Sequence, residues 1–332
     1  MRSFASDNNS GVHPEVMAAI IEANRDHAAG YGDDRWTERA AECVRQVFGE
    51  EARPFFLFNG TGANSVALQA VTRSFHSILC AATAHIYVDE CNAPARMTGC
   101  QLIAVATPDG KLTPDLLRPH LQHFGDCHHA QPGAVYISQA TELGTLYTVE
   151  EVRAIASLVH AHGMKLHMDG ARLANACAAL GCTMREVTVD AGVDILSLGG
   201  TKNGMMMGED VAADIKYYRK QSAQLASKMR YLSAQFIPYL DGLWLRNAQH
   251  ANRQARRLAA ALARFPQLRL TQPVETNQLF IAMPRTVIAR LSERYFFYVW
   301  NEAADEVRFV TSWDTTDEDI DALVDALAEI ME

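Results

Sequence analysis

Lys202 lies on a glycine-rich turn in the run Ser197-Leu198-Gly199-Gly200-Thr201-Lys202-Asn203-Gly204. The turn directly follows an apolar run that is typical of a buried strand. Its amine is therefore expected at the carboxyl edge of a sheet, where open α/β folds bind ligands. The spacing does not match the glycine and lysine motif of a phosphate-loop NTPase. Lys202 can instead act as a nucleophile whose amine forms an imine with a carbonyl. Taken alone, however, this run would also fit a lysine on an exposed turn.

A carboxylate ends a second apolar run, in Leu166-His167-Met168-Asp169-Gly170-Ala171-Arg172. The interval between Asp169 and Lys202 suits a strand–helix–strand unit, so both side chains can meet at one edge of the sheet. Pyridoxal phosphate (PLP) needs such a pair: an amine for its aldehyde and an anion that keeps its ring nitrogen protonated as an electron sink. The pair predicts a PLP enzyme with a Schiff base at Lys202 and Asp169 against the ring nitrogen, although Asp-Gly can also be a simple turn.

Small residues in Phe58-Asn59-Gly60-Thr61-Gly62-Ala63-Asn64 lead into a helical pattern. At a helix N-terminus, such residues expose backbone N–H groups and a hydroxyl, which suit the phosphate of the cofactor. Farther along, His85 could stack on the pyridine ring, although a lone histidine is more often structural. The motifs thus follow in the order phosphate cradle, ring-nitrogen partner and imine lysine.

Short apolar and β-branched runs alternate with helical segments through the first two thirds of the chain. This alternation predicts an α/β fold with a mostly parallel sheet that is covered on both faces. One helix should run from Val149 to about His162 and end at Gly163, which suits a left-handed cap. The expected strands are residues 86–88, 102–105, 134–137, 165–168 and 193–198.

A second, smaller domain is expected after the long helical pattern that runs from Gly242 to about Phe265. We expect a large α/β domain over residues 1–245, including the N-terminal segment, and a small α+β domain over residues 246–332. The small domain should contain strands at 278–282, 296–300 and 307–310 and an acidic amphipathic helix at 317–330.

Composition and charge narrow the class of protein. The 332 residues are 48% hydrophobic, enough for a sizeable core, and their formal charge of −9 gives no basic field for nucleic acid or an anionic membrane. The start lacks the apolar stretch of a signal peptide, and no run approaches the roughly 18 apolar residues of a membrane span. A cytoplasmic protein is expected. The seven cysteines include no C-x-x-C pair, so we expect no metal.

Several separate motifs follow one another along the chain. They are Ser6-Asp7-Asn8, Tyr31-Gly32-Asp33-Asp34, Gly60-Thr61-Gly62-Ala63-Asn64, Thr83-Ala84-His85, His167-Met168-Asp169-Gly170-Ala171-Arg172, Gly200-Thr201-Lys202-Asn203, Lys228-Met229-Arg230 and Arg308. Together they resemble the L-threonine aldolases, which are PLP enzymes of the β-eliminating lyase type with the aspartate aminotransferase fold, and most of all the low-specificity bacterial branch. The resemblance implies a fold type I large domain with a seven-stranded type of sheet.

The resemblance also implies roles for individual residues. His85 would stack on the ring, and Gly60, Thr61 and Thr201 would lie near the phosphate. Ser6, Arg172 and Arg308 would hold the carboxylate of an amino-acid substrate, and bidentate recognition by arginine makes physical sense there. Two further residues imply a homo-oligomer, usually a tetramer in this family: Arg230 would reach the phosphate of a neighbouring subunit, and Tyr31 would lie near a shared substrate site. The family's loop histidine falls at His128 or His129, and the alignment favours His128.

The implied activity is reversible retro-aldol cleavage of L-threonine, L-allo-threonine and related β-hydroxy-α-amino acids to glycine and an aldehyde. His85, His128 or a water held by them would remove the β-hydroxyl proton. An aminotransferase or a β-eliminating lyase could use the same Lys202 and Asp169. Release of ammonia or a need for an oxo acid would distinguish those reactions from aldol cleavage. A binding module without turnover is the non-enzymatic alternative.

Overall fold

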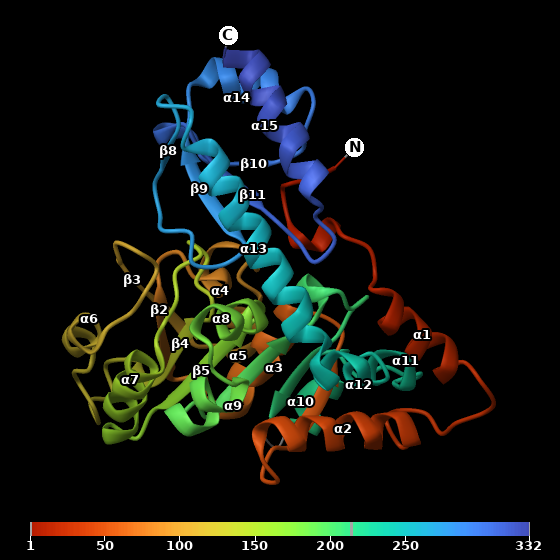
Figure 1. The fold of residues 1–332 in the computed structure, drawn as a ribbon. Coiled ribbons are helices and arrows are strands. Elements are labelled where there is room, and N and C mark those ends of the chain that lie inside the picture. Colours follow the sequence, from red (N-terminus) through yellow and green to blue (C-terminus); the bar gives the residue numbers. More distant parts are fainter. Residues whose placement is uncertain (1, 213–214, 332) are drawn as a thin grey trace.

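A large, mostly parallel sheet forms the centre of the chain in the computed structural model, which describes residues 2–212 and 215–331 (Figure 1). The strands lie in the order β1-β7-β6-β5-β4-β2-β3. The neighbouring pairs from β6 to β3 are parallel, whereas β7 is antiparallel to both β1 and β6. The predicted fold class is confirmed. The strands are β1 (Pro54–Leu57), β2 (His76–Ala81), β3 (Gln101–Val105), β4 (Gln131–Ser138), β5 (Lys165–Gly170), β6 (Ile195–Gly199) and β7 (Glu209–Ala212).

Helices connect the strands and cover the large sheet (Figure 1). They include α1 (Pro14–Ala23), α2 (Arg35–Phe48), α3 (Gly60–Val71), α4 (His85–Val88), α5 (Ala93–Thr98), α6 (Pro114–Leu117), α7 (Val149–Ala161), α8 (Leu173–Leu180), α9 (Met184–Val187), α10 (Lys216–Gln221), α11 (Arg230–Ser233), α12 (Phe236–Pro238) and α13 (Trp244–Leu262). Two more helices, α14 (Arg285–Ser292) and α15 (Asp317–Met331), lie in the C-terminal part. None of the described helices is both long and apolar enough to cross a membrane.

Helix α7 illustrates how local sequence sets the ends of these elements. Thr148 and Glu151 form a reciprocal capping box at its N-terminus, which satisfies backbone donors that the helix leaves unpaired. The helix ends at Ala161 with His162 as its C-cap, and Gly163 follows with a φ of 71°. Glycine adopts this left-handed conformation at little cost, so the helix ends where the sequence predicts.

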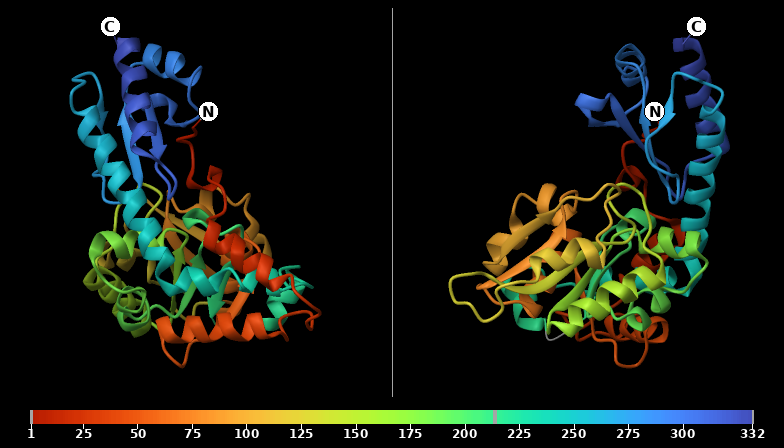
Figure 2. Two further views of the ribbon diagram at one scale, coloured as in Figure 1. Left: turned by 45° about the vertical axis from the view of Figure 1, so that its right-hand side comes forward. Right: turned by 90° about the vertical axis from the view of Figure 1, so that its left-hand side faces the viewer.

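A second sheet and its own hydrophobic cluster form the C-terminal part. The sheet has the order β10-β11-β9-β8, and all of its neighbouring strands are antiparallel. Helix α13 runs from the large sheet to this second one, and the two parts are separate lobes in Figure 2. Two separate cores support our proposal of a domain boundary near residue 245. The strands are β8 (Arg269–Leu270), β9 (Gln278–Ala282), β10 (Tyr298–Asn301) and β11 (Glu306–Val310).

The N-terminal segment contacts the C-terminal lobe. Phe4 is fully buried in the second hydrophobic cluster, and its backbone bonds to Phe296 and Val310. The same segment then passes the carboxyl edge of the large sheet, where Asp7 is buried. Residues near the start of the chain therefore belong in space to both lobes.

Some predicted elements are wrong. Residues 86–88, expected as a strand, form helix α4, because the loop after β2 closes helical hydrogen bonds from Val88 to Ala84 and from Asp89 to His85. Tertiary context here overrides a short β-branched run. In the second sheet, the strand expected at 296–300 begins only at Tyr298.

Candidate active site

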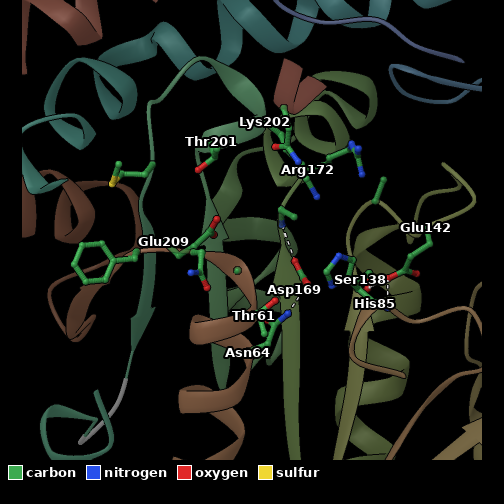
Figure 3. Close-up of a pocket in the computed structure, with 17 residues that line it drawn as sticks. Thr61, Asn64, His85, Ser138, Glu142, Asp169, Arg172, Thr201, Lys202 and Glu209 are labelled. Carbon is green, nitrogen blue, oxygen red and sulfur yellow. Dashed lines mark hydrogen bonds between the residues drawn. The ribbon is translucent and has the colours of Figure 1, made fainter. Parts of the chain in front are cut away.

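A pocket of about 370 Å³ opens at the carboxyl ends of β4, β5 and β6, beside the N-terminus of α3. Lys202 and Arg172 lie toward one end of it, and Asp169 lies at the other, between Asn64 and His85 (Figure 3). Its lining includes many of the side chains that the motifs single out, together with residues from outside them. The lining residues are Asn8, Phe58, Asn59, Gly60, Thr61, Asn64, His85, Ser138, Ala140, Glu142, Asp169, Ala171, Arg172, Thr201, Lys202, Met207 and Glu209.

Lys202 lies on the 3₁₀ helix η4 (Thr201–Asn203), directly after β6. The tight turn requires Gly199, because a Cβ there would lie 2.7 Å from the Cα of Ala171. Burial and the positive charge of Arg172 lower the pKa of the Lys202 amine. A lowered pKa leaves more of the amine unprotonated, which is the form that attacks a carbonyl.

Asp169 ends β5, the parallel neighbour of β6, so the sheet itself brings Asp169 and Lys202 to one edge. Its Oδ2 accepts hydrogen bonds from Tyr136 Oη (2.7 Å) and Asn64 Nδ2 (2.9 Å), and its Oδ1 accepts one from the Ala171 backbone N–H (2.8 Å). Burial alone would raise its pKa, but the Tyr136 hydrogen bond and the charge of Lys202 lower it below the usual value. Asp169 is thus a buried group held as an anion.

The N-terminus of α3 faces the same pocket. Asn59 caps this helix by accepting a hydrogen bond from the Gly62 backbone N–H at 2.8 Å. Gly60 and Thr61 follow the cap, and Thr201 lies across the pocket from them (Figure 3). Unpaired N–H groups at a helix N-terminus attract an anion, so this end of the pocket suits a phosphate.

His85 has a carboxylate partner that the sequence did not indicate. Its Nδ1 lies 2.7 Å from Oε1 of Glu90, whose side chain is fully buried and also accepts from Asn64 Nδ2. The Glu142 carboxylate accepts a hydrogen bond from the His85 backbone N–H (2.9 Å) and another from Ser138 Oγ (2.6 Å). Burial alone would lower the pKa of His85, but the Glu90 hydrogen bond and the charge of Asp169 raise it.

We expect Glu90→Gln to reduce kcat/KM by about 10- to 100-fold, because a well-placed base contributes about 10²- to 10⁴-fold and the variant keeps the imidazole. Without the carboxylate, the pKa of His85 falls, so neutral His85 persists to lower pH. The acid limb of the kcat/KM profile should therefore move to lower pH. Glu15→Gln, an exposed change on α1, is the matched control with an unchanged profile. An unmoved acid limb in Glu90→Gln would contradict a proton-transfer role for His85.

Arg172 forms a buried, bidentate ion pair with Asp7. Its Nε lies 2.8 Å from Oδ2 and its Nη2 lies 2.9 Å from Oδ1, and Asn277 Nδ2 donates to the same carboxylate at 3.0 Å. Among the described residues, Nη1 has no hydrogen-bond partner. The pair thus orients Arg172 and leaves the Nη1 group for a ligand.

Arg308 on β11 approaches from the second sheet. Its guanidinium lies 4.6 Å from the Trp300 ring centroid, and its Nη2 donates to the Ala5 carbonyl at 3.2 Å. Burial and the like charge of Arg172 lower its pKa to about 10. Among the described residues, its Nε is buried without a hydrogen-bond partner, and no carboxylate pairs with it. Arg172 and Arg308 carry two positive charges, and the Asp7 carboxylate balances one of them. The remaining positive charge favours binding of an additional anion here.

A family model described as beta-eliminating lyase matches residues 3–285. The chain belongs to this beta-eliminating lyase family. The resemblance that the motifs indicate is confirmed.

Three similar proteins match this chain over nearly their whole lengths. The low specificity L-threonine aldolase of Pseudomonas aeruginosa is 46% identical over 323 residues, which are 95% of this chain and 93% of the relative. The low specificity L-threonine aldolase of a Pseudomonas species is 43% identical over 99% of this chain and 98% of its own. A solved structure of Leishmania major threonine aldolase has a TM-score of 0.93 and 29% identity, over 100% of both chains.

Five predicted site residues lie outside the lining of this pocket, namely Arg308, described above, and Ser6, His128, Tyr31 and Arg230. Ser6 is near, because its hydroxyl accepts from the Asn8 backbone N–H at 3.2 Å beside the buried Asp7. His128 is exposed in the loop before β4, which places it at the opposite edge of the sheet. Tyr31 is 54% exposed, and its backbone N–H bonds to Ser227, three residues before Arg230. Tyr31 and Arg230 thus belong to neighbouring segments of one surface.

Sequence reasoning missed several polar residues of the site. Asp7 and Asn64 lie inside two of the sequence motifs, Ser6-Asp7-Asn8 and Gly60-Thr61-Gly62-Ala63-Asn64, so the sequence did contain a signal for them. Glu90, Tyr136 and Glu142 carried no such signal, because each is an isolated polar residue whose partner comes from another element.

Proposed function

We propose that this chain is a PLP-dependent, low-specificity L-threonine aldolase that cleaves L-threonine or L-allo-threonine reversibly to glycine and acetaldehyde. The observation that carries the proposal is the placement of Lys202 and Asp169 on adjacent strand ends, with Arg172 and Arg308 beside them. The names of the similar Pseudomonas proteins support the substrate class.

The pocket residues fit PLP by their chemistry. Lys202 would hold the cofactor covalently, Asp169 would bind its ring nitrogen, and the N-terminus of α3 with Thr61 and Thr201 would hold its phosphate. His85 would stack on the ring. When bound, PLP supplies the electron sink that stabilises negative charge at the substrate Cα.

The substrate carboxylate would lie between Arg172 and Arg308, with the Ser6 hydroxyl as a further donor. These contacts would turn the amino acid so that its Cα–Cβ bond stands perpendicular to the cofactor ring. That bond then overlaps best with the electron sink and is the one that breaks. The arginines therefore select the reaction as well as the substrate.

A base must remove the β-hydroxyl proton while the Cα–Cβ bond breaks and the β-carbon leaves as an aldehyde. His85 is in the pocket, and the Glu90 carboxylate raises its pKa and so its basicity. His128 of a neighbouring subunit, or a water held by either histidine, is the alternative base. A proton returned to Cα completes glycine, so atoms and charge balance.

Arg308→Lys should raise KM for L-threonine and reduce kcat/KM by about 30- to 150-fold, because a charged hydrogen bond contributes about 2–3 kcal/mol. Lysine keeps the positive charge but loses the planar fork. Steady-state kinetics measure the change. Arg285→Lys, at an exposed position in the same lobe, is the matched control. An unchanged KM in Arg308→Lys would show that Arg308 does not bind the substrate carboxylate.

We also propose a cytoplasmic homotetramer built as a dimer of dimers. Tyr31 and Arg230 lie on one surface away from this chain's pocket, which suits residues that complete the site of a neighbour. His128, at the opposite sheet edge, would likewise reach only another subunit's pocket. Light scattering of the purified protein measures the assembly, and a monomer would contradict it.

The first experiment measures acetaldehyde and glycine released by the PLP-loaded protein from L-threonine and L-allo-threonine. Equal amounts of both products are expected from at least one substrate. Release of ammonia, or turnover only with an added oxo acid, would indicate an eliminating lyase or an aminotransferase instead. No turnover despite bound cofactor would support a binding module.

A further inference from the structure

The loop before β4 gathers metal-binding side chains at the edge of the sheet away from the pocket. His123, Asp126, Cys127, His128 and His129 lie within it. Because the pocket lies at the carboxyl end of β4 and this loop leads into its amino end, the two are separate places in this chain.

Two consecutive turns place every third side chain of the loop together. The Asp126 backbone N–H bonds to the His123 carbonyl at 3.1 Å, and the His129 backbone N–H bonds to the Asp126 carbonyl at 3.2 Å. The His123 and His129 rings are 4.0 Å apart, centroid to centroid, and Asp126 lies with them.

One side chain holds the backbone of all three residues. Gln131 Nε2 lies within hydrogen-bonding distance of three carbonyls, those of His123 (3.2 Å), Asp126 (2.8 Å) and His129 (2.9 Å), which share its two hydrogens. Its Oε1 accepts from the Gly125 backbone N–H at 2.7 Å. The loop is thus arranged before any ligand arrives, which reduces the entropy lost on binding.

The side-chain atoms lie at distances that suit one metal ion. One ligand atom each from His123, Asp126 and His129 falls within 4.8 Å of the others. Asp126 Oδ2 lies 3.7 Å from His129 Nε2, near the roughly 3.3 Å that two ligands of a tetrahedral Zn²⁺ would have. Asp126 Oδ1 accepts from the His128 backbone N–H at 3.0 Å, which orients the carboxylate with Oδ2 toward His129.

We propose that His123, Asp126 and His129 form a binding site for a divalent transition-metal ion, best matched by Zn²⁺. Imidazole nitrogens favour Zn²⁺ over Mg²⁺ or Ca²⁺, which prefer all-oxygen sites. Three protein ligands leave a fourth position for water. This inference differs from the expectation of no metal.

A second group, Asp126, Cys127 and His128, shares the carboxylate and is the competing ligand set. The two sets differ in one atom type, because only the second supplies sulfur. A Zn–S bond is about 2.3 Å, whereas Zn–N bonds are about 2.0–2.1 Å. X-ray absorption at the zinc edge therefore distinguishes them.

The test titrates chelator-treated, PLP-loaded protein with ZnCl₂ in competition with a chromogenic zinc indicator. We expect one tight equivalent of Zn²⁺ per chain. His123→Ala and His129→Ala should each weaken Zn²⁺ binding by more than about 10- to 100-fold. That range is the loss expected when a residue only supports a metal ligand without touching the ion. The double variant should lose the equivalent, and circular dichroism checks that it folds.

The matched control is His160→Gln. His160 has the same 43% side-chain exposure as His129 and also contacts an aspartate, Asp194, at 2.7 Å, but its group contains no second histidine. This variant and Cys127→Ser should keep wild-type Zn²⁺ affinity, and the bound ion should have only nitrogen and oxygen neighbours. Equal affinity in the wild type and the double variant, a loss in Cys127→Ser alone, or zinc–sulfur scattering would each overturn the proposed triad.

Discussion

Replacing Lys202 by alanine is expected to reduce kcat by on the order of 10⁴-fold or more, the scale at which enzymes lose activity with their covalent nucleophile. The amine lies in the pocket with a lowered pKa. No other side chain of the described pocket supplies an amine. Glycine and aldehyde release measures turnover, and the visible absorbance of the cofactor measures its covalent attachment.

The control for Lys202→Ala is Lys216→Ala, at an exposed position on α10. It should keep both turnover and absorbance. Lys202→Ala should lose both, but should still bind PLP through the phosphate site and Asp169. Substantial turnover in Lys202→Ala would show that Lys202 does not hold the cofactor covalently. The fold assignment would not be affected.

Four parallel strands, β3, β4, β5 and β6, and the Lys202–Asp169 pair could be predicted because each depends on local sequence. An apolar run followed by a functional side chain marks a strand and its carboxyl end, and parallel neighbours bring those ends together. By contrast, the parallel strand β2 was missed, and β1 and β7 were not predicted either. β1 and β7 have only four residues each, and β7 reaches its place through pairing with both β1 and β6 rather than through a strong pattern of its own.

The site beyond that pair depends on contacts between distant segments. Asp7 reaches Arg172 across 165 positions, and Arg308 reaches Ala5 across 303. Neither contact has a spacing signal, because it arises only when the N-terminal segment passes between the two lobes. The resemblance named the arginines as ligand-binding residues, but it could not indicate that Asp7 already holds one of them.

Asp169→Asn is expected to reduce kcat by about 10²- to 10³-fold, similar to the loss of a key electrostatic group in other active sites. Asparagine keeps the size of the side chain and can still accept from Tyr136, but it carries no charge. The ring nitrogen would then lose its proton, and the electron sink would weaken. Unlike Lys202→Ala, this variant should retain the absorbance of covalently attached cofactor, so the two variants separate attachment from electron withdrawal.

Tyr136→Phe is the graded control for Asp169→Asn, because it removes one hydrogen bond to the carboxylate and keeps the charge. Tyr136 lowers the pKa of Asp169, so its loss raises that pKa, and activity should then decline at a higher pH on acidification. At neutral pH the decrease in kcat should stay below about tenfold, because one hydrogen bond contributes about 0.5–1.5 kcal/mol. Wild-type turnover in Asp169→Asn would show that the carboxylate does not serve the ring nitrogen. A large loss in Asp169→Asn with a small one in Tyr136→Phe would locate the effect in the charge, which is the property that burial, Tyr136 and Lys202 together determine.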